Sequence, residues 1–139
     1  MEVDFAFACD YADLSGKIHA LGIGFDTIFA REVPARHPIF YVVAQLRSSV
    51  AEAGVKEFEF RLIDPDGTDV IKPLKGSFEV PAPAGVTETK GRIGMAFHNV
   101  RFPRYGHYSL HLVVQGREMV RLPLRVAPQP QPQPPQQQE

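Results

Sequence analysis

The chain has 139 residues, of which 44% are hydrophobic and 22% are charged, as in ordinary globular proteins. Its formal net charge is −1, which argues against a dedicated nucleic-acid-binding protein, because such proteins carry an excess of lysine and arginine. Cys9 is the only cysteine, so a fold held together by intramolecular disulfides is excluded.

The first half of the chain shows the alternation of apolar and polar side chains that is typical of β-strands. Residues 3–9 form the first expected strand, with Val3, Phe5, Phe7 and Cys9 on its apolar face. The cysteine is expected to be buried as a small apolar side chain. Three further strands are expected at residues 18–25, 39–47 and 58–62.

The second half continues the same pattern up to residue 126. Its strands are expected at residues 78–80, 93–97, 108–114 and 120–126. No long helical pattern separates them. Pro123 falls on the outward-facing side of the last strand, which predicts an edge strand because proline cannot donate a ladder hydrogen bond. Together these segments predict an all-β domain of about eight antiparallel strands.

One segment, residues 102–110, narrows the fold class; it reads FPRYGHYSL. In immunoglobulin-like domains a tyrosine stands two residues before a core position of the penultimate strand, and its hydroxyl bonds to the backbone upstream. Tyr108 and Leu110 occupy these two positions. We therefore expect an immunoglobulin-like β-sandwich over residues 1–126, without the cysteine pair and the tryptophan of antibody domains.

The C-terminal residues 127–139 are almost entirely proline and glutamine and contain no large apolar side chain. Such a segment cannot offset the entropy lost in its own ordering, so we expect a disordered tail.

The N-terminus and the hydropathy of the chain bear on its location. Residues 1–4 lack the basic and apolar regions of a signal peptide, and no apolar run reaches the ~18 residues that a membrane helix needs. We expect a cytoplasmic protein that does not insert into a membrane.

The outer face of the last two strands is the first candidate binding surface. If residues 115–117 form a hairpin loop, His111 lies opposite Arg121, and His107 lies opposite Arg125. This basic face would receive an acidic protein partner or a phosphate group. The alternative is an edge that charged side chains keep soluble, which is a common protection against edge-to-edge pairing.

The acidic turn at residues 64–69 is the second candidate. Asp64, Asp66 and Asp69 recur near the spacing of a calcium-binding loop, but the glycine and the glutamate that an EF-hand loop requires at fixed positions are missing. The choice is therefore between a plain hairpin turn and a weak cation site.

No catalytic or metal-binding pattern is evident in the sequence. His107 and His111 are four residues apart on one strand face, which separates their Cα atoms by about 13 Å, too far to clasp one metal ion. Cys9 has no histidine near it in the sequence that could act as a base. Motifs for a serine nucleophile elbow or a phosphate-binding loop are also missing. We expect a protein that is not an enzyme and carries no metal or cofactor.

Two N-terminal stretches carry a family resemblance: VDFAFACDYA at residues 3–12 and LGIGFDTI at residues 21–28. With the later FPRYGHY segment, they resemble an uncharacterised bacterial family, the domain of unknown function 6941. The resemblance covers residues 3 to about 126 and implies a bacterial cytoplasmic β-domain with no known activity. It singles out residues 21–27 as a signature, in which we interpret Gly22 and Gly24 as shaping a bulged strand.

These features predict a non-catalytic interaction or assembly module. Its partner is expected to be a protein, acidic if it meets the basic face, or a second copy of the chain if two edge strands pair. The alternative is a β-sandwich that binds a small ligand or a cation through its end loops.

Overall fold

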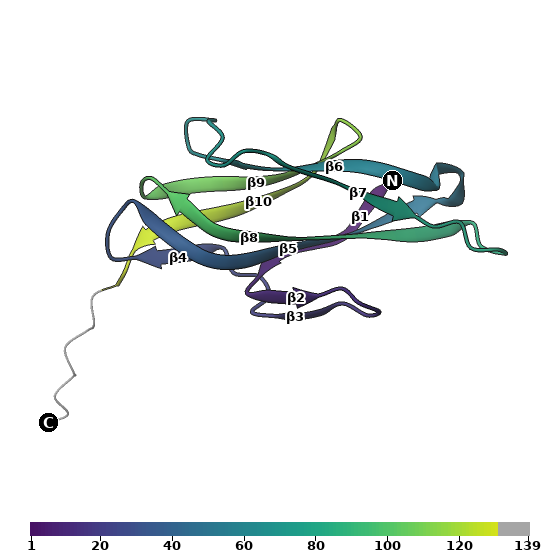
Figure 1. Cartoon of the computed structure of the whole chain (residues 1–139), viewed down its shortest axis with the longest axis horizontal. Helices are drawn as coiled ribbons and strands as arrows, with labels where there is room; N and C mark the ends of the chain where they lie inside the picture. The colour runs from purple at the N-terminus through teal and green to yellow at the C-terminus, as the bar shows by residue number, and fades with distance from the viewer. Residues whose placement is uncertain (131–139) are drawn as a thin grey trace, which may run out of the picture.

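The computed structural model describes residues 1–130, and β-strands make up most of this part of the chain. Two sheets pack face to face, and a short hairpin lies outside one of them (Figure 1). The three-stranded sheet contains, in spatial order, β1 (Glu2–Cys9), β5 (Ala35–Ser49) and β8 (Glu88–Phe102). The five-stranded sheet contains, in spatial order, β4 (Thr27–Ala30), β10 (Arg117–Pro128), β9 (Gly106–Val114), β6 (Gly54–Ile63) and β7 (Leu74–Val80). The hairpin consists of β2 (Tyr11–Asp13) and β3 (His19–Leu21), and a 3₁₀ turn at Val50–Glu52 joins β5 to β6.

The all-β class is confirmed, but the number of strands and one pairing differ from the prediction. Residues 1–130 contain ten strands, and β4 runs parallel to β10. One cause lies where a single strand was expected at residues 18–25. Gly22 and Gly24 have φ values of +69° and +83°, so the chain turns between β3 and β4 instead of continuing as one bulged strand.

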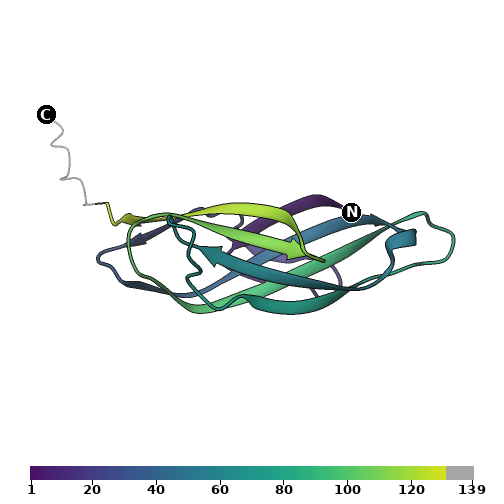
Figure 2. The ribbon, with the colours of Figure 1, turned by 90° about the horizontal axis from the view of Figure 1, so that it is seen from above.

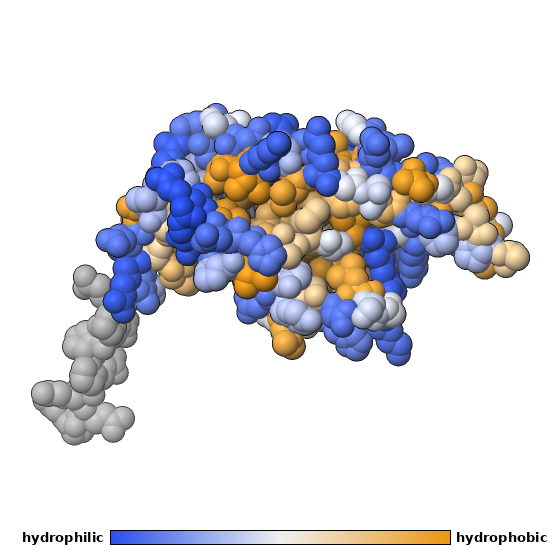
Figure 3. All heavy atoms as spheres, in the orientation of Figure 1, coloured by the Kyte–Doolittle hydropathy of each residue, from blue (hydrophilic) through white to orange (hydrophobic). Residues whose placement is uncertain are grey.

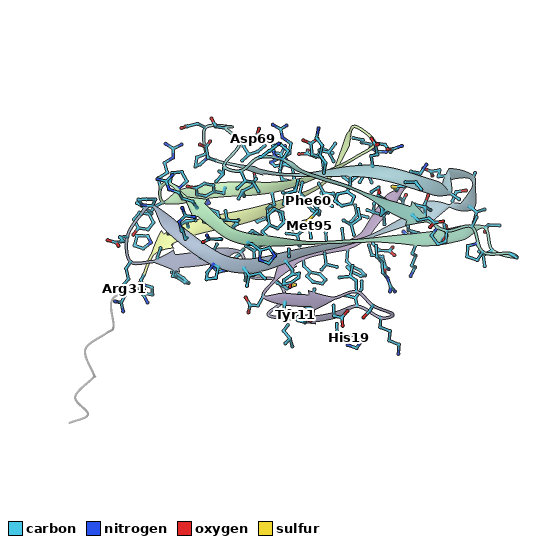
Figure 4. The ribbon with its side chains drawn as sticks, in the orientation of Figure 1. Tyr11, His19, Arg31, Phe60, Asp69 and Met95 are labelled. Carbon is cyan, nitrogen blue, oxygen red and sulfur yellow. The ribbon has the colours of Figure 1, made fainter. Side chains whose placement is uncertain are left out.

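The main core fills the space between the two large sheets. Phe40 of β5 and Phe97 of β8 stack with their ring centroids 4.9 Å apart, and Phe60 of β6 meets Phe97 edge-on at 5.7 Å. Phe60 and Met95 point into this space from opposite sheets (Figure 4). The strands of both sheets run roughly along the long axis of the domain (Figure 2), so inward-facing side chains of the two layers meet along much of its length.

A β-bulge near Asp4 changes which residues of β1 face this core. The register of β1 against β5 shifts between Val3 and Phe5. Val3 packs against the main core, whereas Phe7 packs against the small core that contains Cys9 on the outer side of the sheet. The expectation that Val3 shares a face with the next three apolar residues of β1 was therefore wrong, because a bulge reverses the alternation.

The β2–β3 hairpin covers part of the outer face of the three-stranded sheet. It buries Cys9 completely, as expected, together with Ala12 and Val43. Leu14, in the loop of the hairpin, sits over Gly94 of β8, where an added Cβ would lie 2.7 Å from a Leu14 methyl group. The hairpin can therefore pack here only because residue 94 is glycine and leaves space for the Leu14 side chain.

The tyrosine corner expected at Tyr108 is confirmed. The Tyr108 hydroxyl donates a hydrogen bond to the carbonyl oxygen of Arg104 at 2.6 Å and accepts one from the Arg104 amide at 3.2 Å. Its ring is buried edge-on against Phe102, with the centroids 5.1 Å apart. These contacts fix the connection between β8 and β9.

The last strand, β10, pairs with β9 along most of its length and with β4 at its C-terminal end. Pro123 lies in the part that pairs with β9 alone, so this part is an edge, as expected. Residues 125–128 pair in addition with β4, and the amide of Gln129 donates to the carbonyl of Ala30. Ordered structure thus continues past the boundary expected at residue 126, and Ala127 is buried. The remainder of the expected disordered tail, residues 131–139, lies outside the described residues.

No helix in residues 1–130 is long and apolar enough to cross a membrane.

Candidate functional site

An apolar surface lies where the edge strand β1 meets the β2–β3 hairpin. Orange apolar atoms interrupt the hydrophilic surface near the hairpin, in the lower part of Figure 3. Figure 4 shows Tyr11 and His19 on the hairpin, outside the three-stranded sheet. Eight residues line a shallow depression here, which we call the apolar site: Phe5, Phe7, Tyr11, Ile18, His19, Ala20, Leu21 and Ile23.

The aromatic part of the apolar site comes from β1 and β2. Downstream of the bulge near Asp4, Phe5 and Phe7 lie on the outer side of β1, and their rings stack with centroids 6.0 Å apart. Tyr11 meets Tyr41 of β5 edge-on at 5.4 Å. The bulge therefore brings the two phenylalanines to the surface, which the alternation in the sequence would have placed in the core.

The aliphatic part is held by the glycine turn of the family signature. Leu21 and Ile23 are 68% and 60% exposed, although their neighbours in the chain are tied down. The amide of Gly24 donates to the carbonyl of Ala8, and the amide of Asp10 donates to the carbonyl of Leu21, both at 2.9 Å. The turn thus presents two apolar side chains from a fixed backbone.

Two carboxylates border the apolar site. Asp10 and Asp13 are exposed, and neither forms an ion pair within residues 1–130. Hydrogen bonds from the hydroxyl and the amide of Ser15 lower the pKa of Asp13, so this carboxyl is negatively charged near neutral pH. Lys17 lies in the hairpin loop, and His19 pairs with Asp13 across the hairpin.

The four residues of the predicted basic face lie on β9 and β10 in the expected register. His111 pairs with Arg121, and His107 pairs with Arg125. Their environments differ from the expectation, however, because Glu118 joins them. It hydrogen-bonds His111, which is only 8% exposed, and lies 3.4 Å from the guanidinium of Arg121.

A second bulge explains why sequence reading missed Glu118. Simple alternation places Glu118 on the same inward side as Val120, but the register of β10 against β9 shifts between these two residues. Glu118 consequently pairs with Val113, whose side chain faces outward together with that of His111. The bulge therefore places a carboxylate on a face that was expected to be uniformly basic.

Ser109, His111 and Glu118 form a connected hydrogen-bond chain on this outer face. The Ser109 hydroxyl lies 2.7 Å from Nε2 of His111, and Nδ1 of the same ring bonds to the Glu118 carboxylate. The bond from His111 is the main cause of a lowered pKa at Glu118, so this carboxylate is ionised and accepts. Arg61 of β6 stands opposite His111 on one side, and Arg121 of β10 stands opposite it on the other.

The carboxylates of the predicted acidic loop are bound by backbone amides and arginines of the same protein. One oxygen of Asp64 accepts the amides of Asp66 and Thr68, both at 2.9 Å, as in an Asx turn. Arg104 forms ion pairs with Asp64 and Asp66.

The third residue of the acidic loop, Asp69, binds a different arginine. Its carboxylate bonds to Arg61 at 2.9 Å and 3.2 Å, and it lies on the side of the domain away from the apolar site (Figure 4). Residues 1–130 contain no group of three or more His, Cys, Asp or Glu side chains positioned for a metal ion. The geometry thus favours the turn over the cation site.

Comparisons with known proteins identify a family and a distant structural likeness. A family model described as a family of unknown function, DUF6941, matches residues 4–127. No curated protein matches the chain. Among solved structures, the Pseudomonas fluorescens alkylpurine DNA glycosylase AlkC, bound to DNA with an abasic site analogue, is similar at 16% identity with a TM-score of 0.48. The match covers 73% of this chain and 27% of that protein, and it carries no conclusion about what this chain binds.

Proposed function

We propose that this chain, which belongs to DUF6941, a family of unknown function, is an interaction or assembly module whose apolar site binds a basic, amphipathic segment of a partner protein. The observation that carries the proposal is the exposure of Leu21 and Ile23 on a backbone that is fixed by hydrogen bonds. Contiguous apolar surface of this kind is typical of binding sites. The bacterial cytoplasmic setting is part of the proposal and comes from the resemblance.

We further propose an immunoglobulin-like β-sandwich as the scaffold of this module. The order of the sheets supports it: β1, β5 and β8 match strands A, B and E of that fold, and β6, β9 and β10 match strands C, F and G. The tyrosine corner at Tyr108 is a second supporting feature. In this assignment the β2–β3 hairpin is an insertion between β1 and β4, and it carries five of the eight residues of the apolar site.

The chemistry of the partner follows from the composition of the apolar site. Full burial of a leucine or isoleucine side chain contributes about 1.5–3 kcal/mol, so a partner segment needs two or more apolar side chains to use Leu21, Ile23 and the stacked phenylalanines. Asp10 and Asp13 border the same depression without a cationic partner in the described part of the chain. Lysine or arginine next to the apolar residues of the partner would complement them.

Peptide display against the full chain tests this proposal. Selected peptides should combine apolar and basic residues and should bind the purified protein in calorimetry. Leu21→Ser and Ile23→Ser should each weaken binding about tenfold or more, because each removes an apolar contact of at least ~1.4 kcal/mol. Asp10→Asn and Asp13→Asn should weaken it less and reduce its dependence on salt.

The matched control is Val55→Ser. Val55 is 69% exposed, like Leu21, but it lies on β6 outside the apolar site. The proposal is refuted if V55S weakens binding as much as L21S, or if the selected peptides bind L21S and I23S unchanged. A dimer in sedimentation experiments that is lost in L21S would identify a second copy as the occupant and would also overturn the proposed partner.

The basic face remains the second proposed contact, for an acidic partner. His107 and Arg125 are exposed, and the Arg125 guanidinium supplies a positive charge there. Glu118 offsets the charge of Arg121 and occupies His111, which makes this face less suited to an acidic ligand than the sequence suggested. The apolar site is therefore the better supported of the two.

A further inference from the structure

We propose that Ser109 is a nucleophile, activated by His111 and Glu118, that accepts the acyl group of a small ester or thioester. A hydroxyl bonded to one imidazole nitrogen, with a carboxylate on the other nitrogen, is the arrangement by which serine is made nucleophilic in unrelated folds. Both contacts are present here. The site lies on the sheet opposite the apolar site, so it is independent of the docking function.

The direction of the hydrogen bonds follows from the charge of Glu118. The ionised Glu118 carboxylate can only accept, so Nδ1 of a neutral His111 carries the hydrogen. Nε2 then has a free lone pair, and the Ser109 hydroxyl donates to it across 2.7 Å. In this tautomer His111 is ready to take the proton of Ser109, which is the role of a general base.

Ser109 faces an uncharged strip of the sheet. It stands opposite Ile63 and Pro123, which carry no charge, whereas Arg61 and Arg121, opposite His111, are paired with Asp69 and Glu118. Ser109 is partly exposed on the outer face of the sheet. A substrate can therefore approach the Ser109 hydroxyl along an uncharged row.

The proposed transfer proceeds in two steps. First, the Ser109 oxygen bonds to the acyl carbon and its proton passes to Nε2 of His111. The bond to the leaving alcohol or thiol then breaks, and the leaving group takes that proton. In the second step, water attacks the acyl carbon and gives a proton to His111, which returns it to Ser109 as the carboxylic acid departs. The sum is hydrolysis of the ester, with no oxidant or reductant required.

Labelling with a fluorophosphonate probe tests the nucleophile directly. The Ser109 oxygen would bond to phosphorus as the P–F bond breaks. His111 would take up the Ser109 proton, and fluoride would leave as the anion. Intact-mass and peptide analysis should find one adduct, on Ser109, in the full chain. Ser109→Ala should abolish it, and His111→Gln should slow it about 100-fold or more. Ser77→Ala is the control, because Ser77 is an exposed serine of the same sheet with no histidine bonded to it in the described residues.

The role of Glu118 as a positioning residue requires its own readout. Glu118→Gln should slow labelling at least about tenfold, because an amide can stabilise the wrong tautomer of His111, whereas Glu118→Asp should keep part of the rate. Hydrolysis of p-nitrophenyl acetate should follow the same order, fastest in the wild type, slower in E118D and slowest in E118Q.

Three results would overturn the proposal. One is no adduct on Ser109 at probe concentrations that saturate a serine hydrolase. Another is labelling of Ser109 that is unchanged in H111Q. The third is equal loss of labelling in S77A and S109A. Circular dichroism of each variant confirms that it is folded, and L21S should label like the wild type, which separates this proposal from the docking function.

Discussion

Replacing Gly22 with alanine should strongly destabilise the domain through the turn that presents the apolar site. Gly22 has φ +69°, a conformation that costs a residue with a side chain about 1–2 kcal/mol. A Cβ at this position would also overlap the carboxylate of Asp10, an exposed side chain that must turn away from its present conformation at a cost of about 0.5–1.5 kcal/mol. The free energy of unfolding should therefore fall by about 1.5–3.5 kcal/mol in G22A.

A second glycine separates the two contributions. Gly24 has φ +83°, but an added Cβ would meet nothing within 4 Å. Gly24→Ala should therefore lose only the backbone contribution of about 1–2 kcal/mol. Asp10→Ala in the G22A background removes the overlapping carboxylate and should recover the remaining difference.

Urea unfolding of the full chain, followed by circular dichroism, measures these differences. The chain has no tryptophan, so its four tyrosines provide the fluorescence signal for a second, independent probe. Equal destabilisation in G22A and G24A would refute the overlap with Asp10. Failure of Asp10→Ala to recover any stability in the G22A background would refute it as well.

Two further predictions concern the corner and the edge strand. Tyr108→Phe removes a buried hydroxyl that bonds both the amide and the carbonyl of Arg104. The free energy of unfolding should therefore fall by about 1–3 kcal/mol. A urea midpoint equal to that of the wild type would contradict the role of the tyrosine corner. The pKa of Asp4 is lowered chiefly by a hydrogen bond from Gln45 and also by Arg47. The ionised carboxyl of Asp4 therefore stabilises the folded state. This stabilisation is present above the ordinary pKa of aspartate, about 3.9, and is lost as the pH falls through the lower pKa of the folded state. Asp4→Asn should therefore make stability less sensitive to acid in this range, and identical pH profiles of D4N and wild-type unfolding would argue against the assignment.

The hairpin of β9 and β10 shows how far local pattern reading reaches. Alternation along both strands and the loop expected at residues 115–117 were sufficient to place His111 beside Arg121 and His107 beside Arg125. The same reasoning failed at Glu118, because a bulge is invisible to a period of two. His111 of the predicted basic face is consequently buried against the Glu118 carboxylate rather than exposed.

The apolar site shows the same limit from another direction. Phe5, Phe7, Leu21 and Ile23 are apolar, and sequence patterning assigns such residues to a core. Here a bulge in β1 and a glycine turn after β3 bring them to one surface. The sequence contained one signal of this site, the pair of glycines in the family signature. It did not indicate on which side of the sheet the chain continues after these glycines.

By itself, the sequence determined the all-β class, the inward faces of β6 and β9, the tyrosine corner and the register of the last hairpin. These features depend on local alternation and on turn chemistry, which a single strand or loop contains in full. Only the tertiary structure decided that β4 pairs in parallel with β10, that the apolar site forms, and that Ser109, His111 and Glu118 converge. The physical reason is that each of these features requires either a contact between distant segments or a backbone irregularity. A backbone irregularity moves a side chain to the face of the sheet opposite to the one that local alternation predicts.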